Sequence, residues 1–210
     1  MTKMMKLSAA LTFVFLMFNP AAAQTVTLLA FGDSLIAGYG LQPSDAFPVK
    51  LEAALKARGH DVKVINAGVA GDTALDGASR VEWALSEEVD AVIVEFGAND
   101  ALRGLTIPQA EQALDQLLTK LSERNLPVLL AGMRAPPNLG PEYQAAFDGM
   151  YPRLAEKHGT LFYPFFLDGV AAEVKLNQAD GMHPNPAGVD VIVSRILPDV
   201  ERLLEKAAAK

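Results

Sequence analysis

The chain contains no cysteine among its 210 residues. Disulfide cross-links, thiolate nucleophiles and cysteine metal ligands are therefore excluded, and stability must come from burial of the core. Histidine is nearly as scarce, because the sequence has only His60, His158 and His183, and no two of them are four residues apart. A zinc-type site is hard to build from such a set, so we expect no bound metal ion and no cofactor.

Positively charged residues are fewer than negatively charged ones. The chain has 18 lysines and arginines against 25 aspartates and glutamates, which gives a formal net charge of −7. Nucleic-acid binding needs clustered Lys and Arg, and we find no such cluster, so we expect no nucleic-acid partner. Apolar residues make up half of the composition. That share predicts one folded domain with a well-filled core, and it leaves the oligomeric state open.

The first residues read as an export signal. Lys3 and Lys6 are followed by an apolar run from Leu7 to Phe18, and Ala21-Ala22-Ala23 stands just before Gln24. These are the parts of a secretory signal peptide. A membrane anchor is the alternative, but the apolar run is shorter than the roughly 20 residues of a bilayer span. We therefore expect residues 1–23 to be cleaved, and residues 24–210 to form a domain in the periplasm or outside the cell, without stable membrane insertion.

Strand-like and helix-like segments alternate along the rest of the chain. Short apolar runs, typical of strands covered on both faces of a parallel sheet, occur at 26–31, 62–66, 91–96, 127–131 and 161–165. Helices are expected at 47–58, 73–85, 108–124, 141–158 and 186–206. In the third of these, apolar residues recur every three or four positions from Ala110 to Leu121, which makes one apolar face. The pattern predicts a three-layer αβα domain with a five-stranded parallel sheet and right-handed crossovers.

Polar motifs stand where the expected strands end. They are Gly32-Asp33-Ser34, Gly68 to Asp72, Gly97-Ala98-Asn99-Asp100 and, before the last helix, Asp180 to His183. In an open parallel sheet the ligand crevice lies beyond the carboxyl ends of the strands. Each motif alone is more typical of a turn with a helix cap. Together they bring a serine, a histidine, a carboxylate and an amide to one edge, which is the set that acyl transfer requires.

Ser34 is the expected nucleophile. A serine hydroxyl reacts at neutral pH when an imidazole takes its proton and a carboxylate fixes the tautomer of that imidazole. His183 and Asp180 supply these groups, and their spacing puts both on one loop. The sequence therefore predicts serine hydrolysis through Ser34, His183 and Asp180. We interpret Asp33 and Asp100, which neighbour catalytic positions, as helix caps or loop ties rather than triad acids.

The same motifs resemble the four sequence blocks of the SGNH, or GDSL, hydrolase superfamily, in order and at ordinary spacings. The blocks are Gly32-Asp33-Ser34-Leu35, Gly71, Gly97-x-Asn99-Asp100 and Asp180-x-x-His183. The stretch from Asn66 to Thr73, with the export signal, is similar to the bacterial periplasmic thioesterase/arylesterase/lysophospholipase branch. The resemblance implies a flavodoxin-like sheet of order 2-1-3-4-5. It also implies that Ser34 is the nucleophile and that Gly71 and Asn99 are oxyanion-hole donors.

Elementary chemistry agrees with that oxyanion hole. The backbone N–H groups of Ser34 and Gly71 and the side-chain amide of Asn99 would meet the charge of the tetrahedral intermediate. Glycine has no side chain to block the oxyanion, and asparagine offers an uncharged N–H donor. Water would then hydrolyse the acyl-enzyme, with His183 acting as base a second time.

The substrate is less clearly encoded. The loop from Met133 to Pro141 leaves the fourth expected strand at the active edge, and it offers an apolar wall for an acyl chain made of Met133, Pro136, Pro137 and Leu139. A surface loop stiffened by prolines is an equal interpretation. We assign Trp83, the single tryptophan, to packing rather than to a ligand platform.

These features predict an esterase for small-molecule carboxylic esters, namely aryl esters and short acyl esters, with acyl thioesters and lysophospholipids as further substrates. Two alternatives stay open. A carbohydrate or peptidoglycan O-acetylesterase would use the same triad in a more polar, open cleft. A lipid- or glycan-binding domain without activity is the non-enzyme alternative, and the intact set of Ser34, Gly71, Asn99, Asp180 and His183 argues against it.

Overall fold

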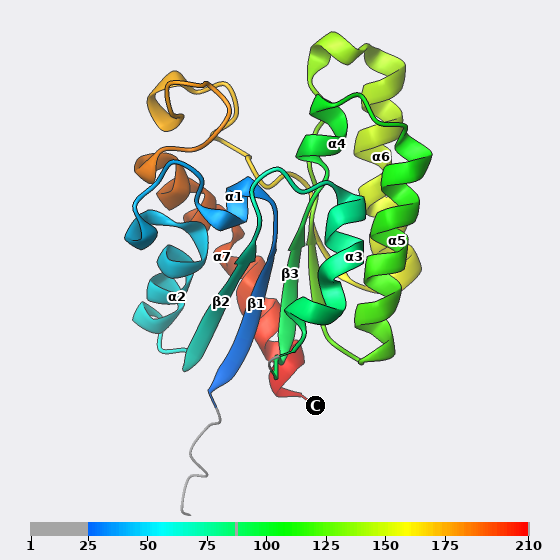
Figure 1. The fold of residues 1–210 in the computed structure, drawn as a ribbon. Helices are drawn as coiled ribbons and strands as arrows, with labels where there is room; N and C mark the ends of the chain where they lie inside the picture. The colour runs from blue at the N-terminus through cyan, green and yellow to red at the C-terminus, as the bar shows by residue number, and fades with distance from the viewer. Residues whose placement is uncertain (1–24, 87, 210) are drawn as a thin grey trace, which may run out of the picture.

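The structure, a computed structural model, describes residues 25–86 and 88–209, so the expected signal peptide at residues 1–23 lies outside the described residues. Five parallel strands form one sheet in the order β2-β1-β3-β4-β5 (Figure 1). The strands are β1 (Val26–Gly32), β2 (Val62–Gly68), β3 (Ala91–Glu95), β4 (Val128–Ala131) and β5 (Leu161–Tyr163). The expected fold class and strand order are confirmed.

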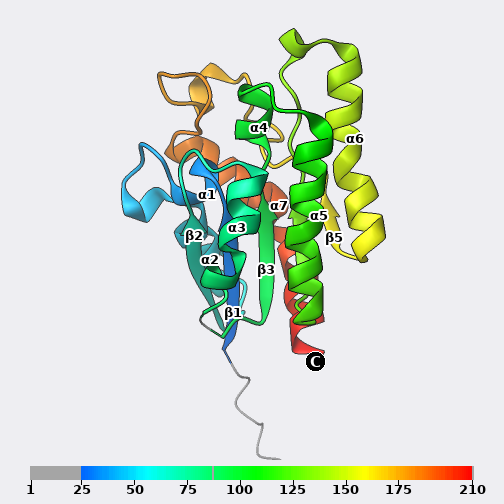
Figure 2. The same cartoon turned by 45° about the vertical axis from the view of Figure 1, so that its right-hand side comes forward.

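Helices cover both faces of the sheet (Figures 1 and 2). On one face α7 packs against β1, β3, β4 and β5, and α2 packs against β2 and α7. On the other, α3 contacts β1 and α5, and α5 contacts α6. Their bounds are α2 (Phe47–Ala57), α3 (Ala74–Ala84), α5 (Ile107–Glu123), α6 (Pro141–His158) and α7 (Pro186–Ala208), within two residues of the expected helices.

The remaining helical elements are short and join the layers. They are α1 (Ser34–Ala37), α4 (Ala98–Leu102), and the 3₁₀ turns η1 (Pro43–Asp45), η2 (Pro137–Leu139) and η3 (Val174–Leu176). Both α1 and α4 begin within three residues of the end of a central strand, after β1 and after β3. They place Ser34 and Asn99 at the carboxyl edge of the sheet.

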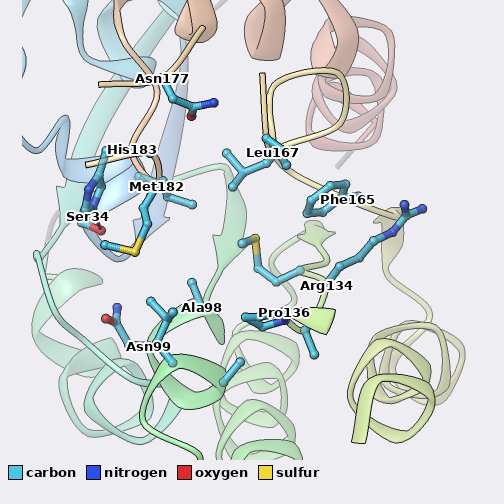
Figure 3. A pocket seen from close by; sticks show the side chains of 18 of the residues that line it. Ser34, Ala98, Asn99, Arg134, Pro136, Phe165, Leu167, Asn177, Met182 and His183 are labelled. Carbon is cyan, nitrogen blue, oxygen red and sulfur yellow. Dashed lines mark hydrogen bonds between the residues drawn. The ribbon is translucent and has the colours of Figure 1, made fainter. Parts of the chain in front are cut away.

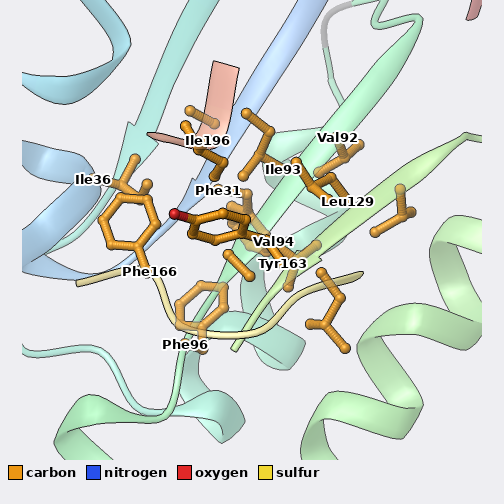
Figure 4. Packing of buried hydrophobic residues seen from close by; sticks show 14 of the residues in the cluster. Phe31, Ile36, Val92, Ile93, Val94, Phe96, Leu129, Tyr163, Phe166 and Ile196 are labelled. Atoms are coloured by element: carbon orange, nitrogen blue, oxygen red, sulfur yellow. The ribbon is translucent and has the colours of Figure 1, made fainter. Parts of the chain in front are cut away.

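The core lies between the sheet and its helices. All of β3 and β4 is buried, as the continuous apolar runs predict for strands covered on both faces. Phe31 and Phe96, near the carboxyl ends of β1 and β3, pack edge to face with ring centroids 5.0 Å apart (Figure 4). The apolar face expected on α5 is buried. Within the described ranges, no helix is long and apolar enough to cross a membrane.

Candidate active site

Ser34 sits on a tight turn between β1 and α1. The strand ends at Gly32, and the Asp33 carboxylate caps α1 by accepting the backbone N–H of Leu35 at 3.0 Å. Gly32 permits the turn because a Cβ there would lie 2.4 Å from Cγ1 of Ile36 and 2.6 Å from the Glu95 carbonyl oxygen. The serine is left half-buried at the first position of the helix. A residue with a side chain at position 32 would therefore displace Ile36 or the end of β3.

The structure brings His183 and Asp180 to this serine. Nε2 of His183 lies 3.0 Å from Oγ of Ser34, and Nδ1 of His183 lies 2.6 Å from Oδ2 of Asp180. The other Asp180 oxygen accepts the backbone N–H groups of Met182 and His183 at 2.9 and 3.0 Å. These two backbone hydrogen bonds, with the imidazole, lower the pKa of Asp180 to about 2. Asp180 is therefore a carboxylate at any ordinary pH, so it accepts from Nδ1 and leaves Nε2 to face the serine.

Two residues that the sequence analysis missed fix the loop of His183. Gln178 donates its backbone N–H to the His183 carbonyl at 2.7 Å, and its side-chain amide donates to the carbonyls of Tyr39 and Pro184 at 2.8 and 2.9 Å. The Tyr39 ring packs against the His183 imidazole with centroids 4.7 Å apart. No motif spacing marks either residue, because their contacts arise only when the loop folds back over the β1 end.

Asn99 is hydrogen-bonded to both segments that carry the other expected oxyanion-hole donors, Ser34 and Gly71. Nδ2 of Asn99 donates to Oδ2 of Asp33 at 3.1 Å and to the Asp72 carbonyl at 2.9 Å, so the α4 side chain bridges the turn of Ser34 and the loop of Gly71. Gly71 has φ +91°, a conformation that residues with a side chain rarely adopt. The positive φ is therefore a second reason for glycine at position 71, besides the absence of a side chain that could block the oxyanion.

Arg80 is a second group that sequence reasoning did not find. Its guanidinium donates to the Asp72 carboxylate at 2.6 Å and to the carbonyls of Ala67 and Gly32 at 3.0 Å each, and it lies 4.4 Å over the Phe31 ring. One side chain thus joins the ends of β1 and β2 to the loop that carries Gly71. A planar donor with several N–H groups suits such a junction.

Asp33 and Asp100 hold backbone in place, as expected. Asp100 accepts the N–H of Ala74 at 2.9 Å, which ties the first turn of α3 to α4, and burial raises the pKa of the Asp100 carboxyl. Neither aspartate contacts His183 by a hydrogen bond in the described part of the chain. The carboxylate that hydrogen-bonds to the His183 ring in this geometry is that of Asp180.

A cavity of about 540 Å³ opens beside Ser34 (Figure 3). Ser34, His183 and Asn99 stand at one end, and Phe165 and Arg134 stand at the other, with the Arg134 guanidinium 4.8 Å over the Phe165 ring. The lining is mostly apolar and includes three of the four expected wall residues, Met133, Pro136 and Pro137.

Leu139 is not part of this wall. It belongs to η2 and packs, half-buried, against the core instead of facing the cavity. The 3₁₀ turn redirects the loop after Pro137, and Phe165 and Leu167, from the segment after β5, complete the lining. Trp83 is 72% exposed on α3 and does not line the cavity. In the described ranges, no group of three or more His, Asp or Glu side chains is placed to hold a metal ion.

A serine, a histidine and an aspartate in hydrogen-bonding order at the carboxyl edge of a parallel sheet are typical of a serine hydrolase. The profile of the GDSL-like lipase/acylhydrolase family matches residues 30–191, and the chain belongs to that family. The resemblance drawn from the four motifs is thereby confirmed.

Relatives and solved structures support the same assignment. The chain is 39% identical over 190 residues to Esterase TesA of Pseudomonas aeruginosa, a match that covers 90% of this chain and 94% of that protein. It is 39% identical over 173 residues to Thioesterase 1/protease 1/lysophospholipase L1 of Escherichia coli K12, which covers 82% and 81%. The crystal structure of AlinE4, an SGNH-hydrolase family esterase, matches with a TM-score of 0.74 at 46% identity, over 88% of this chain and 99% of that one.

Proposed function

We propose that the protein is a serine-dependent carboxylic ester hydrolase that forms an acyl-enzyme on Ser34. The observation that carries the proposal is the unbroken hydrogen-bond chain from Asp180 through His183 to the Ser34 hydroxyl. Relatives named as an esterase and as a thioesterase and lysophospholipase support the same chemistry. With the export signal expected at residues 1–23, we place this activity in the periplasm or outside the cell.

The proposed reaction uses these hydrogen bonds in order. Nε2 of His183 takes the hydroxyl proton as Oγ of Ser34 attacks the acyl carbonyl carbon, and Asp180 stabilises the imidazolium that forms. The intermediate collapses, the bond to the leaving group breaks, and His183 returns the proton to the leaving oxygen or sulfur. Water then attacks the acyl-enzyme with His183 as base, which releases the acid and restores Ser34.

The oxyanion would accept hydrogen bonds from the backbone N–H groups of Ser34 and Gly71 and from the Asn99 amide. Without substrate, the two Asn99 N–H bonds point to Asp33 and to the Asp72 carbonyl. We propose that the forming oxyanion replaces one of these acceptors. Because the amide is already held at its nitrogen end, little reorganisation is needed when the charge develops.

The cavity favours an acyl or aryl group over a sugar. Met133, Pro136, Phe165 and Leu167 offer hydrocarbon and almost no hydrogen-bonding groups. Each methylene removed from water there contributes about 0.8 kcal/mol, whereas sugar hydroxyls would find few partners besides Arg134, Asn177 and Asn99. The lining supports aryl esters, acyl esters and acyl thioesters ahead of the O-acetylesterase alternative, which needs a more polar cleft.

Fluorophosphonate labelling tests the proposed function. The wild-type protein should gain the mass of one phosphonyl group, located on Ser34 by peptide mapping, because the reagent reacts with a serine activated by an adjacent imidazole. His183→Ala should abolish the labelling while leaving the fold intact. A wild-type protein that takes up no label would favour the binding domain without activity.

Chain-length preference is expected to depend on Phe165, at the far end of the cavity. Phe165→Ala should lower kcat/KM for the octanoyl p-nitrophenyl ester. The loss should correspond to roughly 1–3 kcal/mol of transition-state binding, the range for apolar differences in a hydrophobic pocket. The acetyl ester should change little, since it does not extend that far. Leu139→Ala is the matched control, because that side chain packs against the core outside the lining. Equal losses on acetyl, butyryl and octanoyl esters for Phe165→Ala would show that this is not the acyl wall.

Chelation provides a separate check on the chemistry. Incubation with EDTA followed by dialysis is expected to leave kcat and KM unchanged, because the proposed steps use only protein groups. The measurement is the rate on the butyryl ester before and after treatment. Loss of activity that added Zn²⁺ or Mn²⁺ restores would contradict the mechanism.

A further inference from the structure

A glutamate is buried beside the strand end that leads into Ser34. Glu95, the last residue of β3, pairs in register with Gly32 of β1 and is fully buried. As a carboxylate, Glu95 would find no donor for Oε1 among the described residues, and only the backbone N–H of Asp33, at 3.5 Å, for Oε2. A Cβ on Gly32 would lie 2.8 Å from that oxygen, so the missing side chain of Gly32 makes the room that Glu95 fills.

Asp33 is the second buried carboxyl, and it faces catalytic groups. One oxygen accepts the N–H of Leu35 in the helix that starts at Ser34, and the other accepts Nδ2 of Asn99. Two adjacent buried carboxyls cannot both be ionised at low cost, so one proton must reside on the pair. Arg80, the nearby cation, is committed to Asp72 and to two carbonyls.

The directions of the pKa shifts say where the proton lies. Burial, followed by the charge of Asp33, raises the pKa of Glu95 well above its usual value. Burial also raises the pKa of Asp33, to about 6, while the Leu35 N–H and a hydrogen bond from Glu95 act in the opposite direction. The proton of the pair therefore resides on Glu95, and Asp33 is the group that ionises.

We propose that Glu95 is a positioning residue that donates its carboxyl proton to Asp33, and that Asp33, held in this way, fixes the Asn99 amide with its N–H groups toward the oxyanion. The inference rests on the proposed function, because it assigns Glu95 a part in that reaction. Glu95 touches no reacting atom. It acts through Asp33, whose acceptor oxygen keeps the Asn99 amide from rotating and presenting its carbonyl oxygen to the oxyanion.

The proton shared by Glu95 and Asp33 also limits the negative charge near the oxyanion. A hydrogen-bonded acid and carboxylate carry one negative charge between them, whereas two carboxylates would oppose the oxyanion that forms nearby. Other charges facing the pair come from several elements. His183 in the catalytic loop lowers the pKa of Asp33 and Asp100 on α4 raises it, while the buried Tyr151 hydroxyl on α6 faces Glu95 and donates to the Phe96 carbonyl.

Two substitutions distinguish a role of Glu95 as a proton donor from a role in packing alone. Glu95→Gln keeps an N–H that can donate to Asp33, and kcat should stay within about threefold of wild type. Glu95→Met has similar volume and no donor, and kcat should fall about tenfold to a hundredfold with KM within about twofold, a fraction of the loss caused by removing an oxyanion donor outright. Ile93→Val, on the same buried strand, is the matched control and should lower thermal stability without changing kcat.

The pH dependence of kcat is a measurement that a change in packing alone would not alter. Asp33 must be ionised to hold Asn99, so protonation of Asp33 should contribute to the fall of kcat as the pH drops through about 6. Without the Glu95 donor the Asp33 carboxylate is less stabilised, its pKa rises, and the acid limb of kcat should move about one unit to higher pH in Glu95→Met. In Glu95→Gln the limb should stay near its wild-type position.

Infrared spectroscopy tests the proton directly and needs only folded protein. Wild-type protein with ¹³C-labelled glutamate should show the carbonyl band of a protonated carboxylic acid at pH 8, and Glu95→Gln should lack it. A missing band in the wild type, or a Glu95→Met enzyme with wild-type kcat and acid limb, would overturn the inference. Such a result leaves the proposed function standing, whereas a wild-type protein that neither hydrolyses esters nor takes up fluorophosphonate would overturn the proposed function instead.

Discussion

Replacing Ser34 with alanine is expected to lower kcat on p-nitrophenyl butyrate by about 10⁴-fold or more, to near the background rate. No other hydroxyl lies within hydrogen-bonding distance of His183 in the described chain, so nothing else there can form the acyl-enzyme. What remains should come from the oxyanion hole and from substrate binding, which alone give a residual rate above water.

The fold should tolerate this substitution. The hydrogen bond that the Ser34 side chain makes is with Nε2 of His183, and α1 is capped by Asp33 rather than by the serine. Alanine is a favourable helix residue, so the thermal midpoint should change little. Ser79→Ala is the matched control, because Ser79 is an exposed serine on α3 whose hydroxyl bonds the Leu75 carbonyl. A Ser34→Ala enzyme with more than about a hundredth of the wild-type rate would exclude Ser34 as nucleophile.

Much of this architecture could be predicted from the sequence, because burial on both faces leaves a simple pattern. The apolar runs predicted β1 and β3, and the spacing from Ala110 to Leu121 predicted the buried face of α5. The short helices α1 and α4 were not predicted, since four or five residues are too few to show a helical period. The four motifs were placed correctly at one edge, because parallel strands bring their carboxyl ends together.

The contacts between motifs could not be predicted in the same way. Glu95 looks like an ordinary charged residue at the end of a strand, and its burial follows only from the register that sets it against Gly32. Arg80 and Gln178 act on backbone carbonyls far away in sequence, and such bonds leave no motif. The direction of the loop after Met133 was equally hidden, so the sequence predicted Leu139 in a cavity lining that contains Phe165 and not Leu139.

Asn99→Ala is expected to lower kcat by about 10²–10³ with little change in KM, which corresponds to about 2.7–4 kcal/mol of lost transition-state stabilisation. The amide nitrogen is held from two sides, by Asp33 and by the Asp72 carbonyl, so it is oriented before substrate arrives. A donor of this kind strengthens its bond only when the carbonyl oxygen becomes an anion. The ground state therefore loses little, and the loss should appear in kcat.

The same substitution removes two hydrogen bonds, so its effect on stability has to be measured separately. The bond to the Asp72 carbonyl contributes about 1 kcal/mol and the bond to the Asp33 carboxylate about 1.5–3 kcal/mol, so thermal unfolding should show a loss for Asn99→Ala. Asn138→Ala, at an exposed position in η2, is the matched control and should match wild type in both assays. Kinetics on butyryl and octanoyl esters, at a temperature where every variant is folded, isolate the catalytic part. A change confined to KM would mean that Asn99 binds the substrate instead of the oxyanion, and the donors would then be the backbone N–H groups of Ser34 and Gly71 alone.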